Sequence, residues 1–120
     1  MRDNCPFCKR IAAGEYDREL SPNGLQAVFA PLNPVIPGHL LVVPWEHIES
    51  AAADPKVAGA ALGYAARIVQ HFGYNANIIT SVGPDATQTV FHMHVHIVPR
   101  HAGDGLHLPW TGQKPAEAAA

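Results

Sequence analysis

The chain has 120 residues, 48% of them hydrophobic, and a formal net charge of −2 at pH 7. This length suits one domain with one core, and a slightly acidic chain without a basic patch argues against tracking along long nucleic acids. The N-terminus carries no apolar signal segment, and no apolar run is long enough to span a bilayer. We therefore expect a cytoplasmic protein with no membrane partner.

Two cysteines in a C-x-x-C spacing stand near the N-terminus. Cys5 and Cys8 are the only cysteines of the chain. In a cytoplasmic protein this spacing favours metal binding or redox chemistry over a structural disulfide. A thioredoxin-type site needs the pair between a strand and a helix of a βαβ unit, whereas this pair stands at the N-terminus, at the start of a short helix expected over residues 6–13. A zinc site and a pair of free thiols remain the alternatives.

Short apolar runs bounded by turn residues predict five β-strands. They are expected over residues 15–20, 25–30, 39–44, 75–82 and 90–98. One long helix follows the third strand, because Asp54 is a good N-cap, Pro55 suits the first helical position and Gly73 suits a helix end. Strands joined by turns around one long helix indicate an α+β fold with a mainly antiparallel sheet. We expect a single domain over residues 1–112 and a disordered tail over residues 113–120.

The last expected strand carries three histidines at alternate positions: His92, His94 and His96. Successive side chains of a strand face opposite sides, so the three imidazoles should share one face and the apolar residues between them should face a core. Those apolar residues are Phe91, Met93, Val95 and Ile97. Three interpretations are open: a zinc site of the His-x-His type, a nucleophilic imidazole with two helpers, and a solvated polar face.

Hydrogen-bond donors without negative charge precede the histidines, and such donors suit phosphate oxygens better than a bare metal. They are Gly83, Gln88, Thr89 and the backbone just before the histidines. His39 follows Pro37 and Gly38 at the start of another apolar strand and is a candidate fourth imidazole. A neutral histidine can attack an electrophilic phosphorus, while flanking histidines orient it and move protons. The surroundings therefore favour phosphate chemistry.

Four segments of the chain carry a specific resemblance to a known family. The run His92-Met93-His94-Val95-His96-Ile97-Val98 resembles the histidine-triad signature, His-φ-His-φ-His-φ-φ with φ apolar. Residues 33–44 resemble the family's upstream segment, residues 83–90 resemble its phosphate-side loop, and Cys5-Pro6-Phe7-Cys8 matches its zinc-carrying members. The resemblance implies a homodimeric nucleotide hydrolase or transferase that acts at the α-phosphate. Its candidate substrates are nucleoside phosphoramidates, aminoacyl-adenylates and dinucleoside polyphosphates.

The resemblance also implies a role for each site residue. His94 would be the nucleophile and form a nucleotidyl-histidine intermediate, with His96, His39 and His92 as the other members of the catalytic set. The substrate-binding set would be Leu32, Asn33, Ser81, Gln88, Thr89 and Val90. The metal set would be Cys5, Cys8, His47 and His92, which would hold a structural zinc ion that pins the N-terminal segment to the catalytic strand. No magnesium is required, because imidazoles and amide donors supply the electrostatics.

Three positions depart from the family's pattern. Pro31 stands where the family often has an Asp or Asn that contacts ribose hydroxyls, Ser81 stands where Asn or Gln is common, and Thr87 replaces a frequent glycine. The first two departures motivate an alternative hypothesis, a nucleotide-binding module without catalytic activity. A third hypothesis is a metal-dependent hydrolase with a metal ion on all three histidines.

Overall fold

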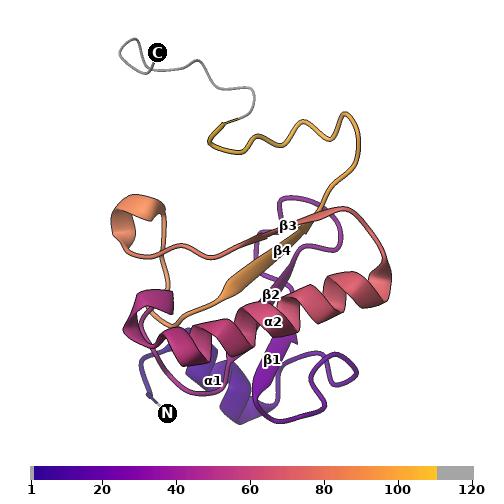
Figure 1. The fold of residues 1–120 in the computed structure, drawn as a ribbon. Coiled ribbons are helices and arrows are strands. Elements are labelled where there is room, and N and C mark those ends of the chain that lie inside the picture. The colour runs from indigo at the N-terminus through magenta and orange to yellow at the C-terminus, as the bar shows by residue number, and fades with distance from the viewer. Residues whose placement is uncertain (1, 111–120) are drawn as a thin grey trace.

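The computed structural model describes residues 2–110 (Figure 1). Within these residues the chain forms helices α1 (Pro6–Ala13) and α2 (Pro55–Phe72) and strands β1 (Gln26–Phe29), β2 (Leu40–Pro44), β3 (Ala76–Ile79) and β4 (Val95–Pro99). Two short 3-10 turns lie at Ala51–Ala53 and Pro84–Ala86. None of the helices in this part of the chain is both long and apolar enough to cross a membrane. The tail expected over residues 113–120 lies outside the described residues.

The four strands form one antiparallel sheet in the order β1-β2-β4-β3. β4 therefore has a partner on each side. His96 lies opposite Leu41 of β2 and opposite Ile79 of β3. The expected α+β fold with an antiparallel sheet is confirmed. The central position of β4 matters because hydrogen bonds on both edges hold the strand that carries His96.

Alternate residues of the strands divide between two cores. One core joins α2 to one face of the sheet and includes Val28, Val42, Ala61, Ala65, Ile68, Val95 and Ile97. The other joins α1 to the opposite face and includes Phe7, Cys8, Ile11, Ala27, Phe29, Leu41 and Val43. Period-2 alternation of side chains on each strand produces this division. As a result, α1 lies on the face that carries the histidines.

Local capping chemistry sets the ends of α2, as the sequence predicts. The Asp54 carboxylate accepts the N–H groups of Lys56 and Val57 at 3.0 and 3.3 Å, which satisfies donors that the first helical turn leaves unpaired. Gly73 ends the helix in the left-handed conformation with φ 70° and donates its N–H to the Val69 carbonyl at 2.8 Å.

The histidine segment is less regular than the sequence predicts. β4 begins only at Val95, so His92 and His94 precede the strand that was expected to start at residue 90. The Met93 N–H donates to a loop carbonyl outside the sheet at 2.7 Å. Met93 is nevertheless buried in the core under α2, so part of the alternation persists. The expectation for Phe91 is wrong, because its side chain is 48% exposed.

The strand expected over residues 15–20 does not form. The Asp17 carboxylate accepts the Leu20 N–H at 2.9 Å and closes a turn within this segment. The Asp17 N–H donates to the Val28 carbonyl of β1 at 2.7 Å. A short acidic side chain that bonds to its own backbone competes with strand pairing, and this local bond accounts for the difference.

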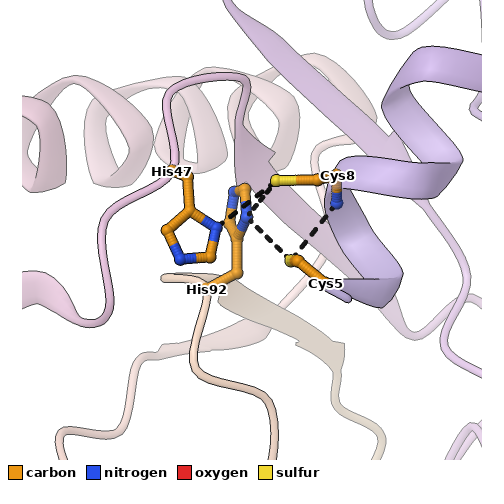
Figure 2. Close-up of side chains that lie close together, drawn as sticks. All are labelled: Cys5, Cys8, His47 and His92. Carbon is orange, nitrogen blue, oxygen red and sulfur yellow. Dashed lines mark hydrogen bonds between the residues drawn. The ribbon is translucent and has the colours of Figure 1, made fainter. Parts of the chain in front are cut away.

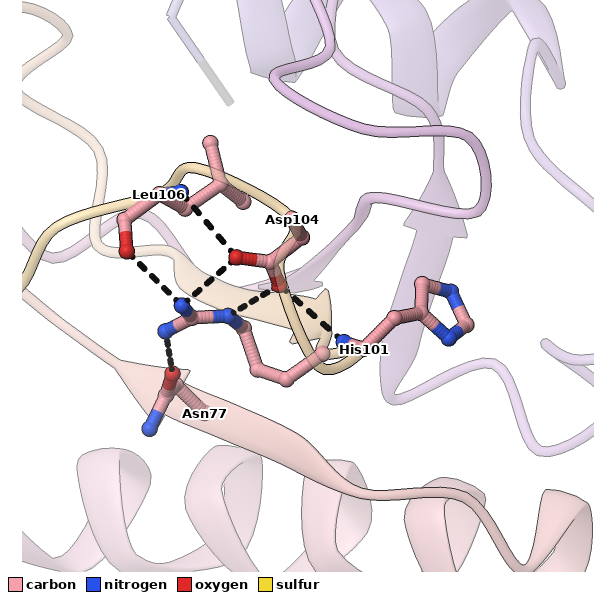
Figure 3. A network of polar contacts seen from close by, with 5 residues as sticks. Asn77, His101, Asp104 and Leu106 are labelled. Carbon is pink, nitrogen blue, oxygen red and sulfur yellow. Dashed lines mark hydrogen bonds and ion pairs between the residues drawn. The ribbon is translucent and has the colours of Figure 1, made fainter.

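Arg100 follows β4 and forms hydrogen bonds that link the end of that strand to β3 and to the loop after β4 (Figure 3). Its Nη1 donates to Asn77 of β3 at 2.7 Å, and Nε and Nη2 donate to the Asp104 carboxylate at 2.8 and 3.0 Å. The hydrogen-bonded guanidinium holds the pKa of Asp104 well below its usual range. Asp104 also accepts the backbone N–H groups of His101 and Leu106. The loop after β4 is thereby folded back against β3.

Candidate metal centre and active site

Four potential metal ligands converge at the first turn of α1 (Figure 2). Cys5 is the N-cap of α1 and Cys8 lies in its first turn, while His47 follows β2 and His92 precedes β4. The ligating atoms of the four side chains all lie within 4.8 Å of one another. The cluster therefore joins three segments that are distant in the sequence.

Three of the distances within the cluster match those of a tetrahedral zinc site. His92 Nδ1 lies 3.4 Å from Cys5 Sγ and 3.5 Å from Cys8 Sγ, and His47 Nδ1 lies 3.3 Å from Cys8 Sγ. Zinc with bonds of about 2.0–2.3 Å in tetrahedral geometry places its ligand atoms about 3.3–3.8 Å apart. Burial raises the pKa of the Cys5 thiol, and a cation at the centre would favour the thiolate. The residues present fit zinc.

Nε2 of His92, the ring nitrogen that faces away from the thiols, also has a hydrogen-bond partner. His92 Nε2 lies 2.7 Å from the Pro44 carbonyl oxygen, which can only accept, so Nε2 carries the hydrogen and Nδ1 turns its lone pair toward the thiols. Burial lowers the pKa of His92 to about 4, which keeps the imidazole neutral, as a metal ligand must be. An imidazole held by a carbonyl at its second nitrogen is typical of a metal ligand.

His94 has the opposite arrangement of its nitrogens. Its Nδ1 lies 2.8 Å from the His92 carbonyl oxygen, so Nδ1 donates and Nε2 keeps its lone pair. Burial lowers the pKa of His94, so the ring is neutral at pH 7. The Thr80 hydroxyl donates to the His94 carbonyl at 2.8 Å and holds the backbone in place. His94 can therefore act as a base or as a nucleophile.

His39 and His96 form a directed pair. The Val35 N–H donates to His39 Nδ1 at 3.2 Å, so His39 Nε2 must be the donor in its 2.9 Å contact with His96 Nδ1. That assignment leaves His96 Nε2 with a hydrogen. Burial lowers the pKa of His39, and burial with the nearby His94 and His39 lowers the pKa of His96 to about 4. His96 thus offers an N–H on a ring whose centroid lies 5.2 Å from that of His94.

A mostly apolar pocket with a volume of about 450 Å³ adjoins these imidazoles. His39, His94 and His96 line it, whereas His92 does not. Of the predicted substrate-binding set, Leu32, Asn33, Thr89 and Val90 line the pocket. Ser81 and Gln88 do not line it. Ser81 follows β3 at the edge of the sheet, one strand beyond the strand that carries His96.

Gln88 shapes the loop before the histidines instead. Its Oε1 accepts the Gly83 N–H at 2.9 Å, and its Nε2 donates to the carbonyls of Glu49 and Val90 at 2.6 and 3.0 Å. Both amide hydrogens are used within the fold, and the side chain is buried. Gln88 is therefore a positioning residue for the loop that brings Val90 to the pocket.

Thr87 in the same loop adopts a left-handed backbone conformation with φ 70°. Among the described residues it is the one non-glycine residue with positive φ. This conformation costs an L-amino acid about 1–2 kcal/mol, because Cβ approaches the backbone. A glycine at this position would avoid the strain, which gives a physical reason for the glycine that the family's pattern often carries.

Two residues of the pocket wall were not singled out from the sequence. The Phe7 ring lies 5.1 Å from the His94 ring and 5.5 Å from the Phe29 ring, between centroids. The Arg10 guanidinium carbon lies 4.1 Å above the Phe29 ring. Phe7 and Arg10 are three residues apart on α1 and so share one face of the helix. Their spacing in the sequence was the one signal that could have placed Phe7 and Arg10 on the same wall.

The chain is similar to known proteins in both sequence and fold. The family model for the HIT domain matches residues 17–103. Protein hit of Bacillus subtilis (strain 168) is 33% identical over 122 residues, which cover 90% of this chain and 79% of that protein.

Two solved structures share the fold. A HIT family hydrolase from Clostridium thermocellum superposes with a TM-score of 0.68 at 26% identity and covers 84% of this chain and 94% of that one. A Zn-bound histidine triad family protein from Mycobacterium smegmatis superposes with a TM-score of 0.72 at 28% identity and covers 87% of this chain and 80% of that one. The second structure shows that proteins of this fold can hold zinc.

Proposed function

We propose a function for this chain from the premise that it belongs to the HIT domain family, whose model matches residues 17–103. Its resemblance to a HIT family hydrolase supports a hydrolase role on nucleotides. The chain acts at the α-phosphate of a nucleotide through a covalent nucleotidyl-histidine intermediate on His94. The single observation that supports this mechanism is the arrangement of nitrogens: Nε2 of His94 keeps its lone pair, Nε2 of His96 carries a hydrogen, and the two ring centroids lie 5.2 Å apart.

In the first step, His94 Nε2 attacks the α-phosphorus and forms an N–P bond. The bond between phosphorus and the leaving group breaks, and the leaving group departs with the bonding electrons. The His96 N–H stabilises its developing negative charge. The ring of His94 becomes positively charged, and the His92 carbonyl, 2.8 Å from Nδ1, stabilises that charge. Nδ1 of His94 thus orients the ring, and Nε2 of the same ring attacks the phosphorus.

In the second step, water attacks the phosphorus and the N–P bond breaks. The electrons of that bond return to His94 Nε2, the proton of the water passes to solvent, and a nucleoside monophosphate is released. Two displacements at one phosphorus replace a single difficult one. Magnesium is not required in this scheme, because imidazole and backbone N–H groups supply the electrostatics.

The apolar pocket would hold the nucleoside. Its volume of about 450 Å³ lies in the usual range for small-molecule sites. Thr89 and Val90 also line the pocket and would supply polar groups for the phosphate. Nucleoside phosphoramidates, aminoacyl-adenylates and dinucleoside polyphosphates all present the α-phosphate that this arrangement needs.

The zinc ion would have a structural role. Cys5, Cys8, His47 and His92 would hold it, and when bound it supplies a cross-link between α1 and the segment before β4. That cross-link would fix two parts of the active site at once. It would hold Phe7, which contacts His94, and the His92 carbonyl, which orients His94.

We also propose that the protein is a homodimer. β3 is an edge strand, and Ile78 on it is 37% exposed. Phe72 before it and Val82 after it are each 48% exposed. An exposed edge with neighbouring apolar side chains suits pairing with a second copy. Sedimentation velocity at micromolar protein concentration tests the dimer, and a monomer at that concentration contradicts it.

Two other hypotheses make different predictions. A nucleotide-binding module without catalysis would bind nucleotides tightly and turn over none, and Pro31 in the pocket wall is the observation that favours it. A catalytic metal ion on all three histidines would need their nitrogens to converge. Instead His92 Nδ1 faces the thiols, and His94 Nδ1 faces a carbonyl. This geometry speaks against the second alternative.

A trapping experiment tests the covalent mechanism. A His96→Ala variant is exposed briefly to adenosine and guanosine phosphoramidates and analysed by intact-protein mass spectrometry. We expect an added nucleotidyl mass that peptide mapping places on residue 94. The double variant with His94→Ala is the matched control and should acquire no mass. An adduct on another residue, or an adduct that persists in the double variant, would contradict the role of His94.

A further inference from the structure

Arg10 contributes the one charged side chain among the described residues that line the apolar pocket. It extends from α1 and is half-buried. A ligand in this pocket therefore meets one permanently charged side chain, and its charge is positive.

A row of aromatic contacts separates Arg10 from His94. Ring centroids are 5.1 Å apart between His94 and Phe7 and 5.5 Å apart between Phe7 and Phe29, and the guanidinium of Arg10 lies 4.1 Å above Phe29. A nucleotide with its α-phosphate at His94 would place its flat, apolar base along these rings. The edge of the base would then lie at Arg10, at the far end of the row.

One nitrogen of the Arg10 guanidinium is hydrogen-bonded within the fold, and the other two are available to a ligand. Its Nε–H donates to the Glu15 carbonyl at 3.1 Å, which fixes the orientation of the fork. Nη1 and Nη2 make no hydrogen bond with residues 2–110. Arg10 thus presents two N–H-bearing nitrogens and no acceptor to whatever occupies the pocket.

The nucleobases differ in what they offer to such a fork. Guanine presents two neighbouring acceptors, O6 and N7, which arginine binds with two hydrogen bonds, whereas adenine presents the N6 amino donor beside N7. We propose that Arg10 reads the base and makes the site selective for 6-oxopurine nucleotides, guanosine and inosine, over adenosine nucleotides. This inference rests on the proposed function in one respect, because it assumes that the phosphate lies at His94.

The test measures binding separately from turnover. The zinc-loaded full chain is titrated with GMP, IMP and AMP by calorimetry. We expect GMP and IMP to bind about tenfold more tightly than AMP, since a bidentate contact of this kind discriminates by roughly 1–3 kcal/mol. IMP carries the same O6 and N7 acceptors but lacks the 2-amino group of GMP, so equal affinity for the two assigns the preference to the O6/N7 edge.

Three variants separate base reading from charge and from packing. Arg10→Gln should weaken GMP and IMP to the level of AMP and change AMP less than about twofold. Arg10→Lys keeps the charge but not the fork, and should lose most of the preference as well. Lys9→Gln is the matched control, because it removes the same charge from an exposed position on α1 outside the pocket. It should leave all three affinities unchanged.

Several outcomes would overturn the inference: equal affinity of the parent for GMP and AMP, equal weakening of all three nucleotides in Arg10→Gln, or full preference in Arg10→Lys. Hydrolysis of guanosine and adenosine phosphoramidates, measured in parallel, keeps the two proposals apart. Preference in binding without hydrolysis would support base reading and contradict the proposed function. Hydrolysis without any preference for a base would support the proposed function and contradict base reading by Arg10.

Discussion

The two ends of the histidine segment differ in what faces the imidazoles. At one end His92 is completely buried, with one nitrogen toward two thiols and the other on the Pro44 carbonyl. At the other end His94 and His96 face a pocket of about 450 Å³. Burial lowers the pKa at both ends. The same residue type, two positions apart, is thus prepared for metal binding in one case and for chemistry on a ligand in the other.

The closed end of the segment, at His92, also supports the open end, at His94 and His96. The His92 carbonyl accepts the Nδ1–H of His94 at 2.8 Å, and Phe7 of α1 contacts both rings. Changes at the closed end should therefore act mainly on stability, and changes at the open end mainly on turnover. Substitutions at either end can test this division.

Replacing the proposed nucleophile should separate chemistry from folding. We expect His94→Ala to lower hydrolysis of nucleoside phosphoramidates by at least about a thousandfold, because it removes the attacking nitrogen. Zinc content and the thermal unfolding midpoint should stay close to those of the parent. His71→Ala, at an exposed histidine of α2, is the control and should leave turnover unchanged. Parent-like turnover in His94→Ala would contradict the assignment.

Removing a metal ligand at the closed end should lower stability more than turnover. Cys8→Ser should lose the bound zinc and lower the free energy of unfolding by at least about 2 kcal/mol, because binding energy of a structural metal is folding energy. Elemental analysis and urea denaturation measure the two effects. Turnover per folded molecule should fall much less than in His94→Ala. An unchanged content of about one zinc per chain would rule out the four-ligand site.

The pH dependence of stability should report the half-buried His96. Its pKa is lowered from 6.5 to about 4 in the folded protein, first by burial and then by the neighbouring imidazoles. Between these values the unfolded chain binds a proton that the folded chain does not. The free energy of unfolding therefore falls as the pH drops from 6.5 toward 4, by up to about 1.4 kcal/mol per pH unit.

The variant His96→Gln isolates this contribution. Urea denaturation of the zinc-loaded parent and variant at pH 7, 6 and 5 should show a shallower decline in the variant. Zinc release at low pH affects both proteins, so the difference between them is the relevant quantity. Equal slopes would mean that His96 titrates alike in the folded and unfolded chains.

The smallest expected effect lies in the loop that leads to the open end. Thr87→Gly relieves a left-handed conformation but adds backbone entropy to the unfolded chain. The free energy of unfolding should rise by about 0.5–1 kcal/mol, and turnover should stay the same. Thr87→Ala keeps Cβ and is the matched control, which should not be stabilised in this way. A destabilised Thr87→Gly variant would show that the loop does not carry this strain.

Signals that act over a few residues were readable from the sequence. Asp54 and Gly73 marked the ends of α2, and short apolar runs marked β1, β2 and β3 to within a few residues. The strand expected over residues 15–20 was wrong, because a side-chain bond of Asp17 closes a turn there. The start of β4 was placed too early, because the Met93 N–H finds a loop carbonyl instead of a strand partner.

The amino-acid sequence alone identifies the reactive groups: a C-x-x-C pair, three alternating histidines and a loop rich in hydrogen-bond donors. The packing of the fold sets which nitrogen of each imidazole is free. It also gives the Gln88 amide its partners within the fold and places Arg10 in the wall of the pocket. The two kinds of information differ in range, because capping and alternation depend on neighbours in the chain. Contacts such as Cys5 with His92, 87 residues apart, depend on how α1 packs against the sheet.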